Sequence, residues 1–426
     1  MPNGKHERSE QRAAERRVLI RGGRVFLGVE HPSERLSIWV RDGEIAEICP
    51  PDDAREQRAA ADGTLVIDAE GGAVLPGLID AHAHVGLLSL DRQLRIPPAS
   101  QAAMIFRNLS SALDQGFTTL RDLGGVDGGL TEAIESGLVE GPRLLPSGAI
   151  MSQTAGHGDV RPRFSSASEN EETGSGLVRP FALCDGVEQV TRTAREQFRA
   201  GATQLKVHAT GGQLSEGDPL DSPQFSLAEL QAFVEVAEDR DSYVTAHCHT
   251  VRGIRRAVEA GVRCIEHGTV MDRETAELLR EQGVYVVPTL TISEVLRRFP
   301  DEWGMTEQML AEAEWLDAAE PESVRLLAEV GVEMGSGSDL IGPAQDTRAW
   351  EIGLKARLLG AAAAIDSATR VNARIMGIDD RVGTIEQGKV ADLVVYRGCD
   401  PVADPELFMS RRPDCVLLSG EAVRPG

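Results

Sequence analysis

The chain has 426 residues, of which 41% are hydrophobic and 26% are charged. This length and balance are typical of a soluble globular protein that is large enough for an α/β barrel and an accessory module. The 44 basic and 67 acidic residues give a net charge of −23, which disfavours nucleic acid and anionic membranes as partners.

The first part of the chain is predicted to form a small β module. Residues 1–16 are polar and charged, and we expect them to be disordered. Short stretches of alternating polarity fill residues 17–76, and the D-G and G-G dipeptides predict hairpin turns between them. The tail, residues 376–426, returns to β character. Because chain ends often lie close together, we expect both ends to form one β-sandwich-like module.

Residues 77–375 have a different pattern, in which short apolar strands alternate with longer helical stretches. Eight strands can be counted from "GLIDAHAH" to "MGSGSDL". This alternation predicts parallel β/α units, and eight of them predict a closed (β/α)8 TIM barrel of the α/β class. One helix has a recognisable start, because Ser226 followed by Glu229 is a capping-box pattern. The polar loop at 157–180 has no assigned structure.

Histidine is concentrated at the predicted strand ends. His82 and His84 lie two residues apart, so both side chains project from the same face of the first strand. A single His-x-His could be an ordinary loop, but seven of the nine histidines lie inside the predicted barrel. Imidazole is a common metal ligand, and barrel enzymes place their chemistry at strand ends. The sequence therefore predicts a metal site, with candidates His82, His84, His157, Lys206, His208, His247, His249, His267 and Asp339.

Five ordered motifs in this region resemble the amidohydrolase superfamily of metal-dependent hydrolases. They are "DAHAH", "LKVHATGG", "AHCHT", "IEHGT" and "GSGSD", and the resemblance runs from about residue 17 to the end. Within the superfamily the chain is similar to the imidazolonepropionase-related and prolidase-like branch, which includes dipeptidases and ochratoxin-hydrolysing amidases. The "HATGG" after Lys206 and the 20-residue step from His247 to His267 carry this narrower match.

The resemblance implies a binuclear centre with two divalent metal ions, which we expect to be Zn²⁺. Manganese and iron remain alternatives, since ligand type alone selects poorly among them. His82, His84 and Asp339 would bind one ion, and His247 and His267 the other. Lys206 would be an N6-carboxylysine that bridges both ions. The simpler readings are a salt-bridged lysine at Lys206, a helix N-cap at Asp339 and a core histidine at His267.

The resemblance also implies a mechanism and a substrate class. A metal-bound hydroxide would attack a carbonyl, and Asp339 would carry its proton to the leaving amine. His157 in "TAGHGD" and His249 would contact a substrate carboxylate, although relatives often have tyrosine at the position of His249. His208 shares the strand face of Lys206 and is either a substrate contact or a support for a metal ligand.

We therefore expect a metal-dependent amidohydrolase that cleaves an amide bond in a small-molecule substrate, a dipeptide or N-acyl amino acid with a free carboxylate. The alternatives are a cyclic amide or lactone hydrolase, or a deaminase, on the same binuclear site. A catalytically inactive binding or scaffolding homologue is disfavoured, because all six ligand positions are filled.

The remaining features bear on location and assembly. No apolar run approaches the roughly 18 residues of a membrane span, and the first seventeen residues show no signal peptide. The six cysteines form no C-x-x-C pair, and several lie in apolar strands, which is typical of free thiols in a reducing compartment. We expect a cytoplasmic homo-oligomer.

Overall fold

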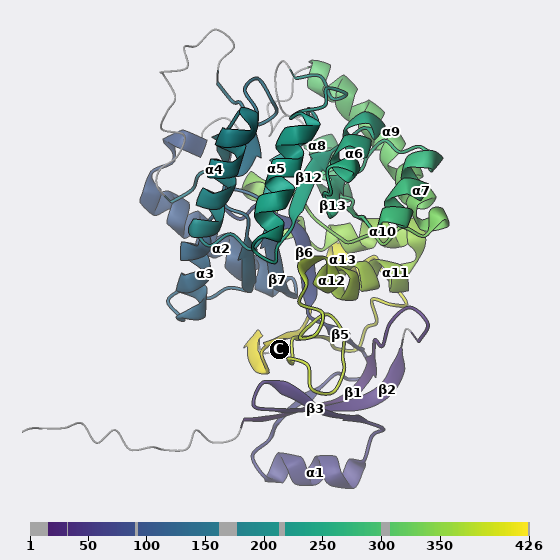
Figure 1. The fold of residues 1–426 in the computed structure, drawn as a ribbon. Helices are drawn as coiled ribbons and strands as arrows, with labels where there is room; N and C mark the ends of the chain where they lie inside the picture. Colours follow the sequence, from purple (N-terminus) through teal and green to yellow (C-terminus); the bar gives the residue numbers. More distant parts are fainter. Residues whose placement is uncertain are drawn as a thin grey trace, which may run out of the picture.

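The computed structural model describes residues 16–31, 33–89, 93–161, 177–212, 218–299 and 307–424. A barrel of alternating strands and helices lies above a smaller β layer that contains the C-terminus (Figure 1). The predicted disordered tail, apart from Arg16, lies outside the described residues, as does most of the loop at 157–180.

The barrel wall consists of parallel strands in two hydrogen-bonded groups. The first group has the order β6-β7-β8, with β6 (Leu78–Ala83), β7 (Phe117–Asp122) and β8 (Arg143–Pro146). The second has the order β10-β9-β11-β12-β13-β14, with β9 (Ile150–Ser152), β10 (Phe181–Leu183), β11 (Leu205–His208), β12 (Val244–Cys248), β13 (Cys264–His267) and β14 (Tyr285–Val287). The predicted α/β class and TIM barrel are confirmed.

The eighth barrel segment is irregular and closes the wall between β14 and β6. Met334 forms a parallel bridge with Val286. On the other side, the amide of Ala81 donates to the carbonyl of Ser336 at 2.9 Å. The "GSGS" composition permits this close approach, since a Cβ on Gly337 would lie only 2.4 Å from the His82 Cβ. The closing segment therefore holds the residues after it next to the end of β6.

Helices surround the strands, as the alternating pattern predicted (Figure 1). The start of α5 (Leu227–Glu238) has the predicted capping box, in which Ser226 and Glu229 satisfy each other's backbone amides. The other helices around the barrel are α2 (Pro98–Asp114), α3 (Gly128–Glu135), α4 (Gly186–Arg199), α6 (Val251–Glu259), α7 (Arg273–Gln282), α8 (Leu290–Arg298), α9 (Glu307–Val330), α10 (Trp350–Leu359), α11 (Ala361–Asp366) and α12 (Asn372–Met376). None of the described helices is long and apolar enough to cross a membrane.

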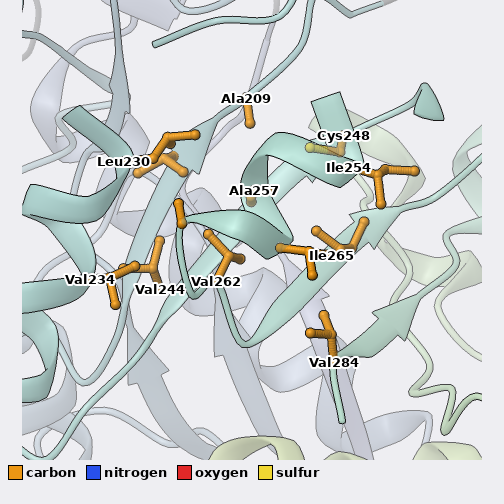
Figure 2. Close-up of a cluster of buried hydrophobic side chains, with 14 of the residues drawn as sticks. Ala209, Leu230, Val234, Val244, Cys248, Ile254, Ala257, Val262, Ile265 and Val284 are labelled. Carbon is orange, nitrogen blue, oxygen red and sulfur yellow. The ribbon is translucent and has the colours of Figure 1, made fainter. Parts of the chain in front are cut away.

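The largest hydrophobic core lies between the second group of strands and the helices outside it. Leu230 of α5 and Ile254 of α6 are fully buried with Val244 and Ile265 of the strands (Figure 2). This apolar outer face fixes β12 and β13 in position, so that their inward side chains are held rigidly. Burial of each such side chain stabilises the fold by about 1.5–3 kcal/mol.

Both chain ends contribute to the β layer below the barrel. The order is β17-β16-β15-β5-β1-β2-β3, with β4 also paired to β1. β5 and β15 join the two ends in antiparallel register, with Leu75 opposite Val394. The elements are β1 (Arg17–Val25), β2 (Glu34–Arg41), β3 (Glu44–Cys49), α1 (Asp53–Ala61), β4 (Leu65–Asp68), β5 (Ala73–Pro76), β15 (Leu393–Tyr396), α13 (Leu407–Ser410), β16 (Cys415–Leu418) and β17 (Glu421–Arg424).

The hairpin turn predicted at Asp42-Gly43 is present, whereas the prediction of hairpin turns at the two G-G dipeptides is wrong. Asp42-Gly43 connects β2 to β3 with Arg41 opposite Glu44, and both turn residues have positive φ. Gly22-Gly23 instead lies inside β1 at a register shift. Gly71-Gly72 connects β4 to β5, which are both parallel to β1. Gly72 is needed for close approach, since a Cβ there would lie 1.9 Å from the Tyr396 carbonyl oxygen.

Candidate metal centre

The first group of site residues comprises His82 and His84 from β6 and Asp339, which follows the closing segment. The Asp339 Oδ1 atom lies 3.3 Å from His82 Nε2 and 3.1 Å from His84 Nε2. The Asp339 amide donates to the His82 carbonyl at 2.8 Å, and its φ of 53° is in the left-handed region. Such a conformation is uncommon for a residue other than glycine and is often found at functional sites. The structure thus brings these three predicted residues together.

The second group comprises His247 from β12, His249 just after the end of that strand, and His267 at the end of β13. Their ligand nitrogens lie within 4.8 Å of one another. The ring centroids of His82 and His267 are 5.0 Å apart, so the two groups are adjacent. His267 Nδ1 shares a 2.8 Å hydrogen bond with Thr289 Oγ1, which leaves its Nε2 free to bind a ligand.

Lys206 of β11 is buried with its charged end in the barrel interior. Its side chain is 1% exposed, and the Nζ atom has no hydrogen-bond partner among the described residues. Burial lowers the pKa of Lys206 to about 8, although Glu266 and Asp339 oppose this effect. A buried ammonium without a partner is costly. The chemistry of this atom therefore fits a lysine that becomes anionic by carboxylation and then binds metal.

His157 and His208 form a third group with His247. The His157 ring lies 4.6 Å from the His208 ring and 4.7 Å from the His247 ring. The "HATGG" motif explains how His157 fits there, because a Cβ on Gly212 would lie 2.2 Å from its Cε1 atom. His208 is buried, and its Nδ1 has no partner among the described residues. The three residues predicted for substrate binding thus all border the site, with the His249 ring stacked against that of His267.

The electrostatics of these histidines favour neutral rings. Burial lowers the pKa of His249 to about 3 and that of His208 well below its ordinary value, and neighbouring imidazoles and Lys206 add to the effect. Neutral imidazole is the form that binds metal and that donates a single hydrogen bond to a carboxylate. Any anchoring of a substrate carboxylate by His249 would therefore rest on hydrogen bonding more than on charge.

Sequence analysis missed a buried carboxylate that contacts the site. Glu266 Oε2 lies 2.8 Å from His82 Nδ1, and Arg121 Nη2 donates to Glu266 Oε1 at 2.6 Å. Burial alone would raise the pKa of Glu266, but Arg121 and His82 outweigh it and hold the pKa below the ordinary value. The available signal was a charged residue inside each of two apolar strands, "TTLRD" and "CIEHG".

A second missed pair lies at the start of β6. Arg348 contacts the Asp80 carboxylate, and the Ser338 hydroxyl donates to the same group at 2.6 Å. The amides of His82 and Ser338 also donate to Asp80, each at 3.0 Å. Asp80 therefore ties the His-x-His strand to the residue before Asp339 and fixes the first group.

Comparison with known proteins agrees with this architecture. The Amidohydrolase family model matches residues 73–423, and the chain belongs to this family of hydrolases. A solved prolidase complexed with N-methylphosphonate-L-proline is 37% identical, with a TM-score of 0.89 over 96% of this chain and 100% of that one. A Xaa-Pro dipeptidase with bound methionine in its active site is 28% identical, with a TM-score of 0.84 over 96% and 100% of the two chains.

Ochratoxinase from Aspergillus niger is 34% identical over 277 residues, which is 62% of this chain. The matched region spans 58% of the fungal enzyme's length. These similarities place the chain in the prolidase- and ochratoxinase-like branch, as its motifs predicted.

Proposed function

We propose that this amidohydrolase cleaves the amide bond of a dipeptide or N-acyl amino acid that bears a free carboxylate. The observation that carries the proposal is the convergence of five predicted ligands and the unpartnered Lys206 on one end of the barrel, bordered by three further histidines. The relatives' bound molecules, N-methylphosphonate-L-proline and methionine, support an amino-acid-like substrate.

The donor set fits two divalent ions, for which zinc is our expectation. His82, His84 and Asp339 would hold one, His247 and His267 the other, and carboxylated Lys206 would contribute to both. When bound, the ions would acidify water and polarise the scissile carbonyl. The chain's own residues would perform the remaining tasks of orientation and proton transfer.

Asp339 is placed to move the proton. Its side chain is 17% exposed, whereas those of His82 and His84 are at most 5% exposed, so it is the most solvent-accessible of the three. We infer that Asp339 accepts the proton of the attacking water and delivers it to the nitrogen of the leaving amine. That transfer completes cleavage of the C–N bond and leaves the carboxylate ready for another cycle.

His157 and His249 would bind the substrate carboxylate, since both rings lie against the ring of His247. His249 is oriented by a 2.9 Å contact between its Nδ1 and Thr269 Oγ1, which leaves Nε2 directed elsewhere. His157 Nδ1 lies 3.6 Å from Asp218 Oδ2. His208, between His157 and His247, would support either the substrate or its neighbouring ring.

A substrate panel tests the proposal. The metal-replete enzyme would be assayed on dipeptides, N-acyl amino acids, their carboxamides, and cyclic amides and lactones. We expect kcat/KM for a free acid to exceed that of its carboxamide by at least about tenfold, as one lost charge-assisted hydrogen bond would give. Turnover of only lactones or cyclic amides would contradict the proposal and favour the alternative chemistry.

A further inference from the structure

The histidines of the proposed metal centre differ in the kind of side chain that contacts the ring Nδ1 atom. His267 and His249 each contact a neutral threonine hydroxyl, at Thr289 and Thr269. On the corresponding side of its ring, His82 contacts a carboxylate, that of Glu266, with Nδ1 at 2.8 Å from Oε2. The two halves of the centre are therefore supported by groups of different charge.

Glu266 is immobilised. The residue is 0% exposed, and its Oε1 atom accepts hydrogen bonds from Arg121 at 2.6 Å and from the Thr245 hydroxyl. Arg121 is itself 0% exposed and donates from Nε to the Ala81 carbonyl at 2.6 Å. Because Oε1 is occupied by these donors, Oε2 is the oxygen that contacts His82. His82 follows Ala81 on the same strand.

The Glu266 carboxylate, paired with the Arg121 guanidinium, has no proton to donate and can only accept a hydrogen bond from His82. The ring proton of His82 is therefore on Nδ1, and Nε2 keeps its lone pair. Nε2 is the atom that faces Asp339. A carboxylate partner also makes the imidazole a stronger donor to a metal than a hydroxyl partner does. The ligand geometry and the ligand strength of His82 would thus both depend on Glu266.

We propose that Glu266, locked by Arg121, is a positioning residue that makes the His82–His84–Asp339 half the tighter of two metal sites. The inference rests on the proposed binuclear centre. It predicts sequential loading, in which the first ion enters the half supported by Glu266 and the second enters the half supported by Thr289.

Zinc binding to the full-length apo-protein tests this, measured by competition with a chromogenic chelator and without substrate. We expect Glu266→Gln to weaken the tighter step by about 10- to 100-fold, the usual effect of removing such a partner. The weaker step should keep its wild-type affinity. The matched variant Thr289→Val should do the reverse. Equal losses in both steps, or no loss in either, would overturn the proposal.

Glu266→Gln leaves the buried Arg121 without its counter-ion and could destabilise the fold. The double variant Arg121→Met/Glu266→Gln removes both charges. We expect it to keep the selective loss of the tighter step, and recovery of wild-type affinity would show that only the orphaned charge mattered. A wild-type protein that binds no zinc would instead contradict the proposed function, so the two failures are distinguishable.

Discussion

Two sets of buried polar groups occupy the barrel interior, and they differ in how they are satisfied. The paired set, Asp80 with Arg348 and Glu266 with Arg121, joins each carboxylate to a guanidinium. The unpaired set, Lys206 Nζ, His84 Nδ1 and His208 Nδ1, has no partner among the described residues. Because buried polar atoms are nearly always hydrogen-bonded, the unpaired set marks where the chain is built to receive something else.

The largest effect is expected when Lys206, the lysine of the unpaired set, is removed. Lys206→Ala should lose most of the bound metal and nearly all activity, because the proposed centre would lose the side chain that contributes to both ions. Metal analysis and kcat/KM of the purified variant would measure both. Lys389→Ala, which removes a lysine from the β layer, should keep two ions per chain. Normal metal content and turnover in Lys206→Ala would remove the bridging role.

Asp339 separates metal binding from proton transfer. Asp339→Asn keeps the size and one oxygen of the side chain but cannot accept the proton, so we expect metal to be partly retained. The rate should fall by roughly two to four orders of magnitude, as for other positioned acid–base groups. Comparing kcat with metal content per chain would test it, and a near-normal kcat would assign the proton to another group.

The surplus histidines should affect selectivity and leave metal content unchanged. His249→Ala and His157→Ala should each lower kcat/KM for a free-acid substrate by roughly ten- to a hundredfold, which corresponds to one hydrogen bond to a charged group. The matched carboxamide should be little affected. His31→Ala, outside the barrel, is the control. An acid-to-amide ratio that stays the same in both variants would place the carboxylate anchor elsewhere.

A third buried cluster differs from both sets, because it contains two acidic side chains and one basic side chain. Glu320 of α9 and Glu351 and Lys355 of α10 are buried together, and Lys355 Nζ lies 3.6 Å from Glu351 Oε1. Burial, with a contribution from Glu351, raises the pKa of Glu320 to about 8. A folded pKa above the unfolded value means that Glu320 destabilises the fold as pH rises from about 4.5 toward 8.

The smallest expected effect follows from this loss of stability with rising pH. Glu320→Gln mimics the protonated acid, so it should leave Tm nearly unchanged at pH 5 and raise it by roughly 2–4 °C at pH 9. Thermal unfolding at both pH values would measure this, with the exposed Glu322→Gln on the same helix as control. The same change in Tm at pH 5 and pH 9 would show that Glu320 is not protonated in the fold.

The clustering of the candidate ligands could be predicted from the sequence, but the buried groups that contact them could not. His82 and His84 were found because strand periodicity and strand-end position are local properties. Arg121 and Glu266 lie 145 residues apart, and Asp80 and Arg348 lie 268 apart, so no local pattern pairs them. The G-G strand connections were misread for a related reason, because pairing to β1 and close approach to β15 decide them.

The β layer joins the two ends of the chain, and this has a consequence for biosynthesis. β5 leads almost directly into the His-x-His strand, yet one of its edges is covered only by β15, and Arg397 reaches back to the Asp68 carbonyl across 329 residues. A chain that emerges from the ribosome therefore presents an uncovered apolar edge until the whole barrel has been synthesised. Such delayed, long-range pairing slows folding and leaves the nascent chain open to aggregation. Completion of the sheet is then the last step, and it follows the synthesis of every strand that carries a candidate metal ligand.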